Sequence, residues 1–442
     1  MKNFEKADII SNVAYKKDKS RFLSVDKQNE LNHQMKEKLL RFVNELQQEP
    51  YRPESMKLID AMMNEMHGKR VKDLYKYRKA GNHVVALLCN AIPPEIVYGM
   101  DNCQPVTVCM GGGEVEQYAD HLTRGMCPVT RSMTGFLMTG MCVFFNVSDY
   151  VIASDVCNCI HQTAQNMDKA AKDVDVFTAR MKDEQSQNLK LDITGFHQWV
   201  EHLKKGEGFN KERLLNYAYI YSRLRELYKN VMELRKAHNP PINGKNSLWA
   251  QQLFLVEDPE KLLHAMQKIE NELRENLHKG TGYNPDGKKK RVMLVAPRIM
   301  PPFTDIYRLV ENNNAIIVCE ESCMGITNTI YDYEKFAALL RDNEQSIDPA
   351  IKYITENMNK NPCACFYDHS MKDIKQKIQD YNVEALILYA FSNCPVMEKK
   401  NKTIAAHLQK ENIPCMQIKT DYLQLYEQEE ELMKKIEKFL VF

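Results

Sequence analysis

The chain has 442 residues, enough for two or three domains, and its 44% hydrophobic and 27% charged residues exclude a disordered protein. A formal net charge of +1 gives no indication of a nucleic-acid partner or an acidic membrane surface. The amino-terminal residues are polar, unlike a secretion signal, and the apolar stretch Met133 to Phe145 is too short to cross a membrane, so we expect a soluble cytoplasmic protein.

Residues 1–80 are polar and helical in pattern, and we assign them to an N-terminal helical region. Three apolar runs of strand length follow, at His83–Asn90, Pro105–Met110 and Asp149–Ser154. With helical segments between them, these runs predict a first parallel α/β domain over residues 81–180. The glycine-rich stretch "MGGGEVE" (110–116) matches neither phosphate-binding fingerprint, so we interpret it as a surface turn.

The pattern becomes helical from about Asp168 to Lys288, and residues 181–288 are predicted to be a helical connecting region. One helix is expected to start at an Asn210 cap and to stop at Pro240–Pro241. A second should start at Asp258–Pro259 and end near Gly280.

Strand-like and helix-like segments alternate regularly in the last 150 residues, which predicts a second, doubly wound α/β domain over residues 289–442. The expected fold is therefore α/β, with two Rossmann-like parallel-sheet domains, an N-terminal helical region and an inserted one. The predicted strands of the second domain are Val292–Ala296, Ala315–Cys319, Ala364–Phe366, Ala385–Ala390 and Cys415–Lys419.

Thirteen cysteines, an odd number, argue against a disulfide framework and leave buried thiols, redox chemistry or metal binding. Because parallel sheets bind ligands beyond the carboxyl ends of their strands, cysteines in those loops are the candidates for chemistry. Cys157 and Cys394 each follow a predicted strand, and Cys127 lies in a probable loop before Pro128. Cysteines that lie within strands or apolar runs are assigned to the core instead, and these are Cys109, Cys142, Cys319 and Cys415.

Three loop cysteines from two α/β units could meet in one crevice and hold an iron–sulfur cluster with one open iron position. Zinc is the competing interpretation, although paired CxxC or HxxxH spacings are missing. His161, four residues after Cys157, is interpreted as a surface residue. Glu320 and Glu321 could face the same crevice as Cys323, or could simply be solvated.

From about Gly81 to its end, the chain resembles the 2-hydroxyacyl-CoA dehydratase and benzoyl-CoA reductase subunits. The resemblance rests on the order and spacing of several segments, of which the "CNC" pair is typical of the larger dehydratase subunit. These segments are "IPPE", "YGMDNCQPV", "CPVTRS", "DYVIASDVCNC", "NPPINGKNSLW", "AIIVCEESCMG" and "LILYAFSNCP" with the "LQKENIPCMQIKTD" that follows it.

The resemblance implies a [4Fe-4S] cluster held by Cys127, Cys157 and Cys394, the cysteines that the strand-end rule also selects. It implies an acyl-CoA substrate, a paralogous subunit in a heterodimer, and a separate homodimeric iron–sulfur ATPase that supplies one electron. The electron would convert the thioester into a ketyl radical anion that loses water. Asn90, where the family often has serine, and Glu95 of the "IPPE" turn are the catalytic candidates.

Other readings of the family remain open. Asn158 stands where the family often has aspartate, and the carboxyl-terminal helix lacks the family's frequent arginine, so this subunit could relay electrons rather than bind substrate. Cys159 and Cys323 are possible additional ligands of an [8Fe-9S] double-cubane cluster. The chain could also be a benzoyl-CoA reductase-type subunit, or a non-catalytic partner subunit.

Overall fold

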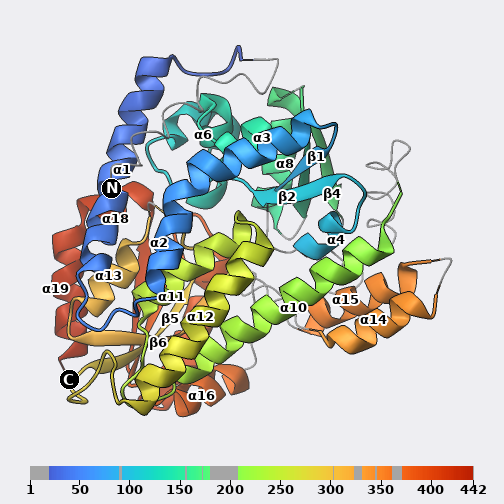
Figure 1. Cartoon of the computed structure of the whole chain (residues 1–442). Helices are drawn as coiled ribbons and strands as arrows, with labels where there is room; N and C mark the ends of the chain where they lie inside the picture. Colours follow the sequence, from blue (N-terminus) through green and yellow to red (C-terminus); the bar gives the residue numbers. More distant parts are fainter. Residues whose placement is uncertain are drawn as a thin grey trace.

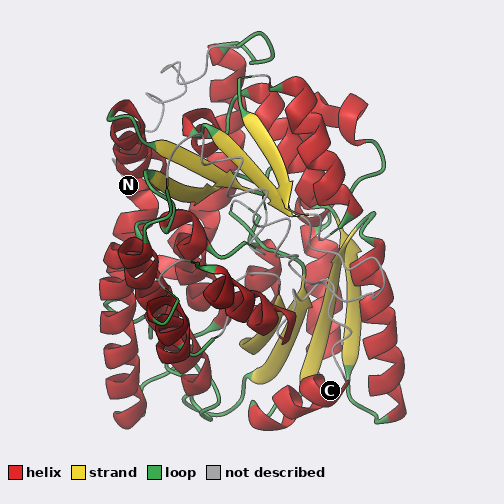
Figure 2. Cartoon of the chain, turned by 90° about the vertical axis from the view of Figure 1, so that its right-hand side faces the viewer, coloured by secondary structure: helices red, strands yellow, loops and turns green. Residues whose placement is uncertain are grey.

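Two four-stranded sheets, each with only parallel strands, form the framework of the chain in a computed structural model (Figure 1). Figure 2 shows one sheet in the upper half and one in the lower half, with helices around both. The predicted α/β fold with two parallel-sheet domains is thereby confirmed. The structure describes residues 19–88, 92–154, 157–171, 173–179, 208–301, 303–322, 331–343, 346–360 and 371–441.

The first sheet has the strand order β2-β1-β3-β4. Its strands are β1 (His83–Leu87), β2 (Cys103–Thr107), β3 (Tyr150–Ser154) and β4 (Asp175–Ala179). Strand β4 corrects the prediction that the chain is helical from Asp168 onward. Pairing with β3, in which Tyr150 lies opposite Asp175, extends this Val-Phe-Thr segment, because β-branched and aromatic residues suit a pleated surface.

The second sheet repeats the topology of the first, with the order β6-β5-β7-β8. Its strands are β5 (Lys290–Ala296), β6 (Ala315–Ser322), β7 (Ala385–Phe391) and β8 (Cys415–Thr420). These confirm four of the predicted strands, and Ala364–Phe366 lies outside the described residues. In each sheet the strand order reverses between the first and third strands, where open parallel sheets place their ligands.

The helical regions before and after the first sheet pack together into one layer. Side chains of α1 (Phe42, Leu46), α10 (Leu224) and α12 (Leu262) belong to a single buried core. The helices of the whole chain are α1 (Val25–Gln47), α2 (Met56–Glu65), η2 (Met66–Arg70, a π-helix), α3 (Val71–Lys79), α4 (Pro94–Tyr98), η3 (Glu116–Ala119), α5 (Asp120–Thr123), α6 (Pro128–Thr139), α7 (Val143–Val147), α8 (Asn158–Ala170), α10 (Lys211–Leu234), α11 (Gly244–Gln251), η4 (Gln252–Leu255), α12 (Pro259–His278), α13 (Asp305–Glu311), α14 (Tyr333–Arg341), α15 (Asp348–Lys360), α16 (Met371–Asp380), α17 (Pro395–Lys410), α18 (Tyr422–Glu427) and α19 (Glu429–Leu440).

The predicted helix starts agree with the structure. The Asn210 side chain accepts a hydrogen bond from the Arg213 N–H at 2.9 Å, and Asp258 caps α12 in the same way. Helix α10 ends at Leu234, before the predicted stop at Pro240.

Helix α10 and the residue after it contact both sheet domains through buried arginines. Within the helix, the Arg225 guanidinium donates to both Glu95 carboxylate oxygens, at 2.7 and 2.9 Å, next to the first sheet. Just after the helix, Arg235 donates to both oxygens of Glu320 on β6, at 2.7 and 2.9 Å. Side-chain exposure is at most 8% in these four residues, so neither pair is a solvated surface contact.

The loop after β2 joins the two sheet domains through a glycine. Gly111 has a φ of +93°, and a Cβ atom there would lie 2.8 Å from the Met300 carbonyl oxygen in the loop after β5. The stretch predicted to be a surface turn is therefore buried, because it passes between the two domains. Loops at the carboxyl ends of β2 and β5 consequently meet.

Removing one partner of the Glu95–Arg225 pair should destabilise the chain, because it leaves a buried, unpaired charge. We expect Glu95→Ala to lower the free energy of unfolding by about 3–5 kcal/mol, measured by urea denaturation. The double variant Glu95→Leu/Arg225→Met should recover most of that loss. A loss below about 1 kcal/mol in the single variant would contradict a structural role for this pair.

Candidate cysteine site

Three cysteines selected from the sequence occupy equivalent places, each immediately before a helix. Cys127 is the N-cap of α6, Cys157 that of α8 and Cys394 that of α17. Cys157 follows β3 and Cys394 follows β7, the third strand of each sheet, so the repeated topology places them at corresponding switch points. Unpaired N–H groups at helix starts stabilise negative charge, and the Ile160 N–H donates to the Cys157 Sγ at 3.4 Å.

The same three cysteines lie at the boundary between the two sheet domains. Cys157 packs on the core of the first domain, and Cys394 packs on the core of the second. Val129, two residues after Cys127, packs against both cores. The structure thus brings together residues that lie 30 and 267 positions from Cys127 in the sequence.

Cys159 is the fourth thiol of this group, which we call the cysteine site: Cys127, Cys157, Cys159 and Cys394. Hydrogen bonds from Cys127 and Cys157 lower the pKa of the Cys159 thiol, and the contacts with Cys159 raise the pKa of Cys127 and Cys157. Burial raises the pKa of Cys394. Close thiols share protons in this way because one sulfur ionises first and the others donate to it.

A buried carboxyl group and a phenol lie close together near α6, the helix that Cys127 caps, and sequence reasoning missed both. The Glu116 Oε1 and the Tyr422 hydroxyl are buried and make no hydrogen bond within the described residues. Burial raises the pKa of Glu116 to about 8, although its Oε2 lies 3.2 Å from the Arg131 Nη1. Tyr422 is close enough to Glu116 and Cys127 for both to influence its titration. In the sequence, only the glycine-rich stretch before Glu116 could have pointed to that residue, and no pattern pointed to Tyr422.

The other candidate residues lie apart from the cysteine site or outside the described residues. Asn90 and Cys323 lie outside them. Glu95 is fully buried, and besides Arg225 it accepts a hydrogen bond from the Tyr331 hydroxyl at 3.0 Å, so its carboxylate is already engaged. Its catalytic role stays a prediction.

The carboxylates near Cys323 are also engaged in ion pairs. Glu320 binds Arg235, and Glu321 binds Lys377. His161 is exposed and contacts Gln165, as expected for a surface residue.

Two of the four cysteines assigned to the core are buried: Cys142 and Cys319 are 2% and 1% exposed. Cys109 and Cys415 are only partly buried. Cys109 lies just beyond β2, and its backbone N–H donates to the Cys142 Sγ at 3.2 Å. A hydrogen bond with the Cys142 thiol also raises the pKa of Cys109.

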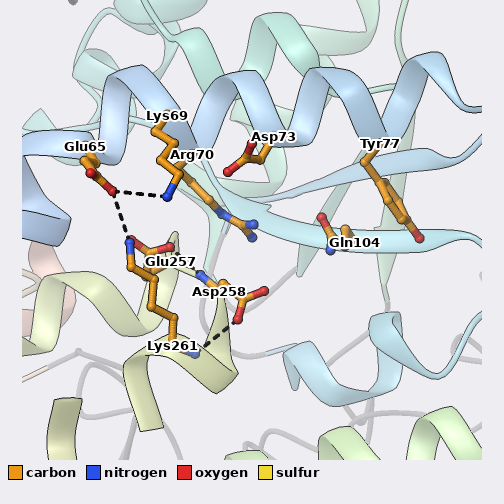
Figure 3. A pocket seen from close by; sticks show the side chains of 9 residues that line it. All are labelled: Glu65, Lys69, Arg70, Asp73, Tyr77, Gln104, Glu257, Asp258 and Lys261. Carbon is orange, nitrogen blue, oxygen red and sulfur yellow. Dashed lines mark hydrogen bonds and ion pairs between the residues drawn. The ribbon is translucent and has the colours of Figure 1, made fainter. Parts of the chain in front are cut away.

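A hollow of about 320 Å³ lies between α3 and α12, near the start of β2 (Figure 3). It is lined by oppositely charged side chains, and its Lys261 lies 3.3 Å from Glu65 and 3.4 Å from Glu257. Its position near Gln104 is toward the amino end of the strand, opposite the edge where parallel sheets bind ligands. These two features make it a weaker candidate than the cysteine site.

Among the described residues, no three His, Cys, Asp or Glu side chains are grouped so as to hold a single metal ion. The described helices also include none long and apolar enough to span a bilayer.

Comparison with known proteins identifies the family of the chain. A family model described as 2-hydroxyglutaryl-CoA dehydratase, D-component, matches residues 89–440. The chain is also 24% identical over 351 residues to the "Putative dehydratase subunit YjiM" of Escherichia coli (strain K12), covering 78% of this chain and 88% of that protein. The chain therefore belongs to the 2-hydroxyglutaryl-CoA dehydratase D-component family.

Proposed function

We propose that this chain is the iron–sulfur subunit of an oxygen-sensitive (R)-2-hydroxyacyl-CoA dehydratase, in which Cys127, Cys157 and Cys394 hold a [4Fe-4S] cluster. The overall reaction removes water from a 2-hydroxyacyl-CoA to give an enoyl-CoA. The observation that carries the proposal is the convergence of three cysteines, each at the start of a helix, at the boundary between two parallel-sheet domains.

The donor set suits an iron–sulfur cluster better than a single ion. It consists of thiols, the ligands that such clusters prefer, and it is partly shielded from solvent. Each thiolate of a cluster can bind a different iron, so the ligands stand farther apart than around one ion.

Helix starts contribute to this function by stabilising negative charge. The amino ends of α6, α8 and α17 direct partial positive charge at the three cysteines, which favours thiolates and a reduced, more negative group beside them. When bound, the cluster would supply one-electron transfer and an iron site for a substrate oxygen.

Glu116 can hold a proton near the site at neutral pH, because its pKa is about 8. Loss of water requires a proton on the departing hydroxyl, and Glu116 Oε1 is a buried source of one. Arg131 holds the other carboxylate oxygen and so fixes the orientation of the group.

We further propose a paralogous subunit as the heterodimer partner and a homodimeric iron–sulfur ATPase as the one-electron activator. The supporting facts are the family membership and the name of the relative YjiM, a putative dehydratase subunit. The driving force for reducing a thioester must come from outside the chain, and ATP hydrolysis by such an activator would supply it.

The contact of Cys159 with Cys127 and Cys157 favours a second candidate. A fourth thiolate would close the open iron position and suit an electron-relaying partner subunit, and with further ligands it would suit the [8Fe-9S] double cubane of a reductase. A benzoyl-CoA reductase-type subunit remains within the same proposal.

Replacing a proposed ligand should remove the cluster. We expect anaerobically purified protein to contain about four irons per chain, or about eight for a double cubane, and Cys127→Ser, Cys157→Ser and Cys394→Ser each to lose most of the iron and the visible absorption. Cys415→Ser, on strand β8, is the matched control and should keep both. Colourless, iron-free wild-type protein would reject the proposal.

The buried Glu116 should make the stability fall as the pH rises. Its folded-state pKa of about 8 exceeds the ordinary 4.5, so the folded chain keeps a proton that the unfolded chain releases between these values. The stabilisation is complete below pH 4.5 and is lost as the pH rises through 8. From pH 6 to 9, wild-type protein should lose roughly 2–3 kcal/mol more of its unfolding free energy than Glu116→Gln. Equal pH profiles in chemical denaturation would show that Glu116 is not protonated in the folded state.

A further inference from the structure

A cavity of about 200 Å³ lies where α1, η2, α7 and the loop after β2 meet. Its wall is rich in methionine, whose flexible, polarizable side chains adapt to varied apolar surfaces. The methionines are Met35, Met63, Met66, Met110, Met141 and Met300.

This cavity is separate from the cysteine site. Phe136 and Met141, at the carboxyl end of α6, line the cavity, whereas Cys127 caps the amino end of the same helix. A helix of 12 residues spans about 18 Å, so the two sites lie at opposite ends of α6.

The π-helix η2 places a histidine in the cavity wall. His67 lines the cavity and keeps accessible surface, and desolvation by the surrounding side chains lowers its pKa to about 4. The ring contacts Phe144 at 5.5 Å between centroids and makes no hydrogen bond within the described residues. Single π turns within longer helices often mark functional sites. The neutral imidazole can both donate and accept a hydrogen bond.

The charge of the cavity wall has one sign. Lys36 on α1 is half-buried, and the described part of the chain provides no ion-pair partner for it. The described lining residues include no aspartate or glutamate. The wall therefore favours an anionic group near Lys36. Its described residues offer that group one positive charge, which suits a ligand with a single negative charge.

From these features we infer that the cavity is a binding site for an amphipathic monocarboxylate that carries a hydroxyl group remote from its carboxylate. The carboxylate pairs with the half-exposed Lys36, the alkyl chain lies among the methionines, and the hydroxyl meets the neutral His67. One water-sized group needs about 10–15 Å³ of such a cavity, so the cavity has room for on the order of a dozen non-hydrogen atoms. The inference does not depend on the proposed iron–sulfur function.

Trp249 lines the cavity and provides a direct reporter. The chain has two tryptophans, so the Trp199→Phe variant leaves Trp249 as the only one. In this background, titration with 8-hydroxyoctanoate should change the tryptophan emission in a saturable way. Octanoate should bind more weakly, and octylamine at least about tenfold more weakly, because it lacks the carboxylate and brings a positive charge near Lys36.

Lys36→Gln and Val143→Phe test whether the ligand binds in this cavity or elsewhere on the protein, with Lys72→Gln as the control. Lys36→Gln should weaken the binding of 8-hydroxyoctanoate at least about tenfold, and Lys72→Gln on the exposed face of α3 should leave it unchanged. Val143→Phe should block binding by filling the cavity, and Lys36→Gln decides the question if that variant does not fold. No saturable change in emission, equal binding of octylamine, or full affinity in Lys36→Gln would overturn the inference.

Discussion

The two buried arginine–glutamate pairs of α10 are the constraint on which the arrangement of this molecule depends. Arg225 holds Glu95 beside the first sheet, and Arg235 holds Glu320 on the second. A buried charge without its partner is costly, so the two pairs fix two points in the carboxyl-terminal half of α10, about 15 Å apart, each to one domain. Since a site shared by two domains needs a defined relative position, α10 acts as the spacer between them.

With the domains fixed, the repeated topology explains why the cysteines meet. Cys157 and Cys394 follow the third strand of their sheets, and each opens the next helix. When the carboxyl ends of two such sheets face each other, corresponding loops converge. Cys127 joins them through α6, whose Val129 touches both cores. The site is thus a product of the fold's internal symmetry rather than of any local sequence motif.

Sequence patterns predicted much of this, and the failures have physical causes. The strand-end rule selected Cys157 and Cys394 because position along a parallel strand is visible in hydrophobic runs, and Cys127 was selected as a loop cysteine before Pro128. Strand β4 was missed, since its five residues depend on pairing with β3. The burial of Gly111 and the proximity of Tyr422 to Glu116 and Cys127 arise from contacts between distant segments, which no local pattern contains.

Diffraction at the iron absorption edge, from crystals grown without oxygen, tests the central claim most directly. The account predicts one compact anomalous peak at the domain boundary, bounded by the Sγ atoms of Cys127, Cys157 and Cys394. A peak that also reaches Cys159 would identify the four-thiolate form of the same site. Iron bound elsewhere, or no anomalous density among these cysteines in freshly prepared protein, would contradict it.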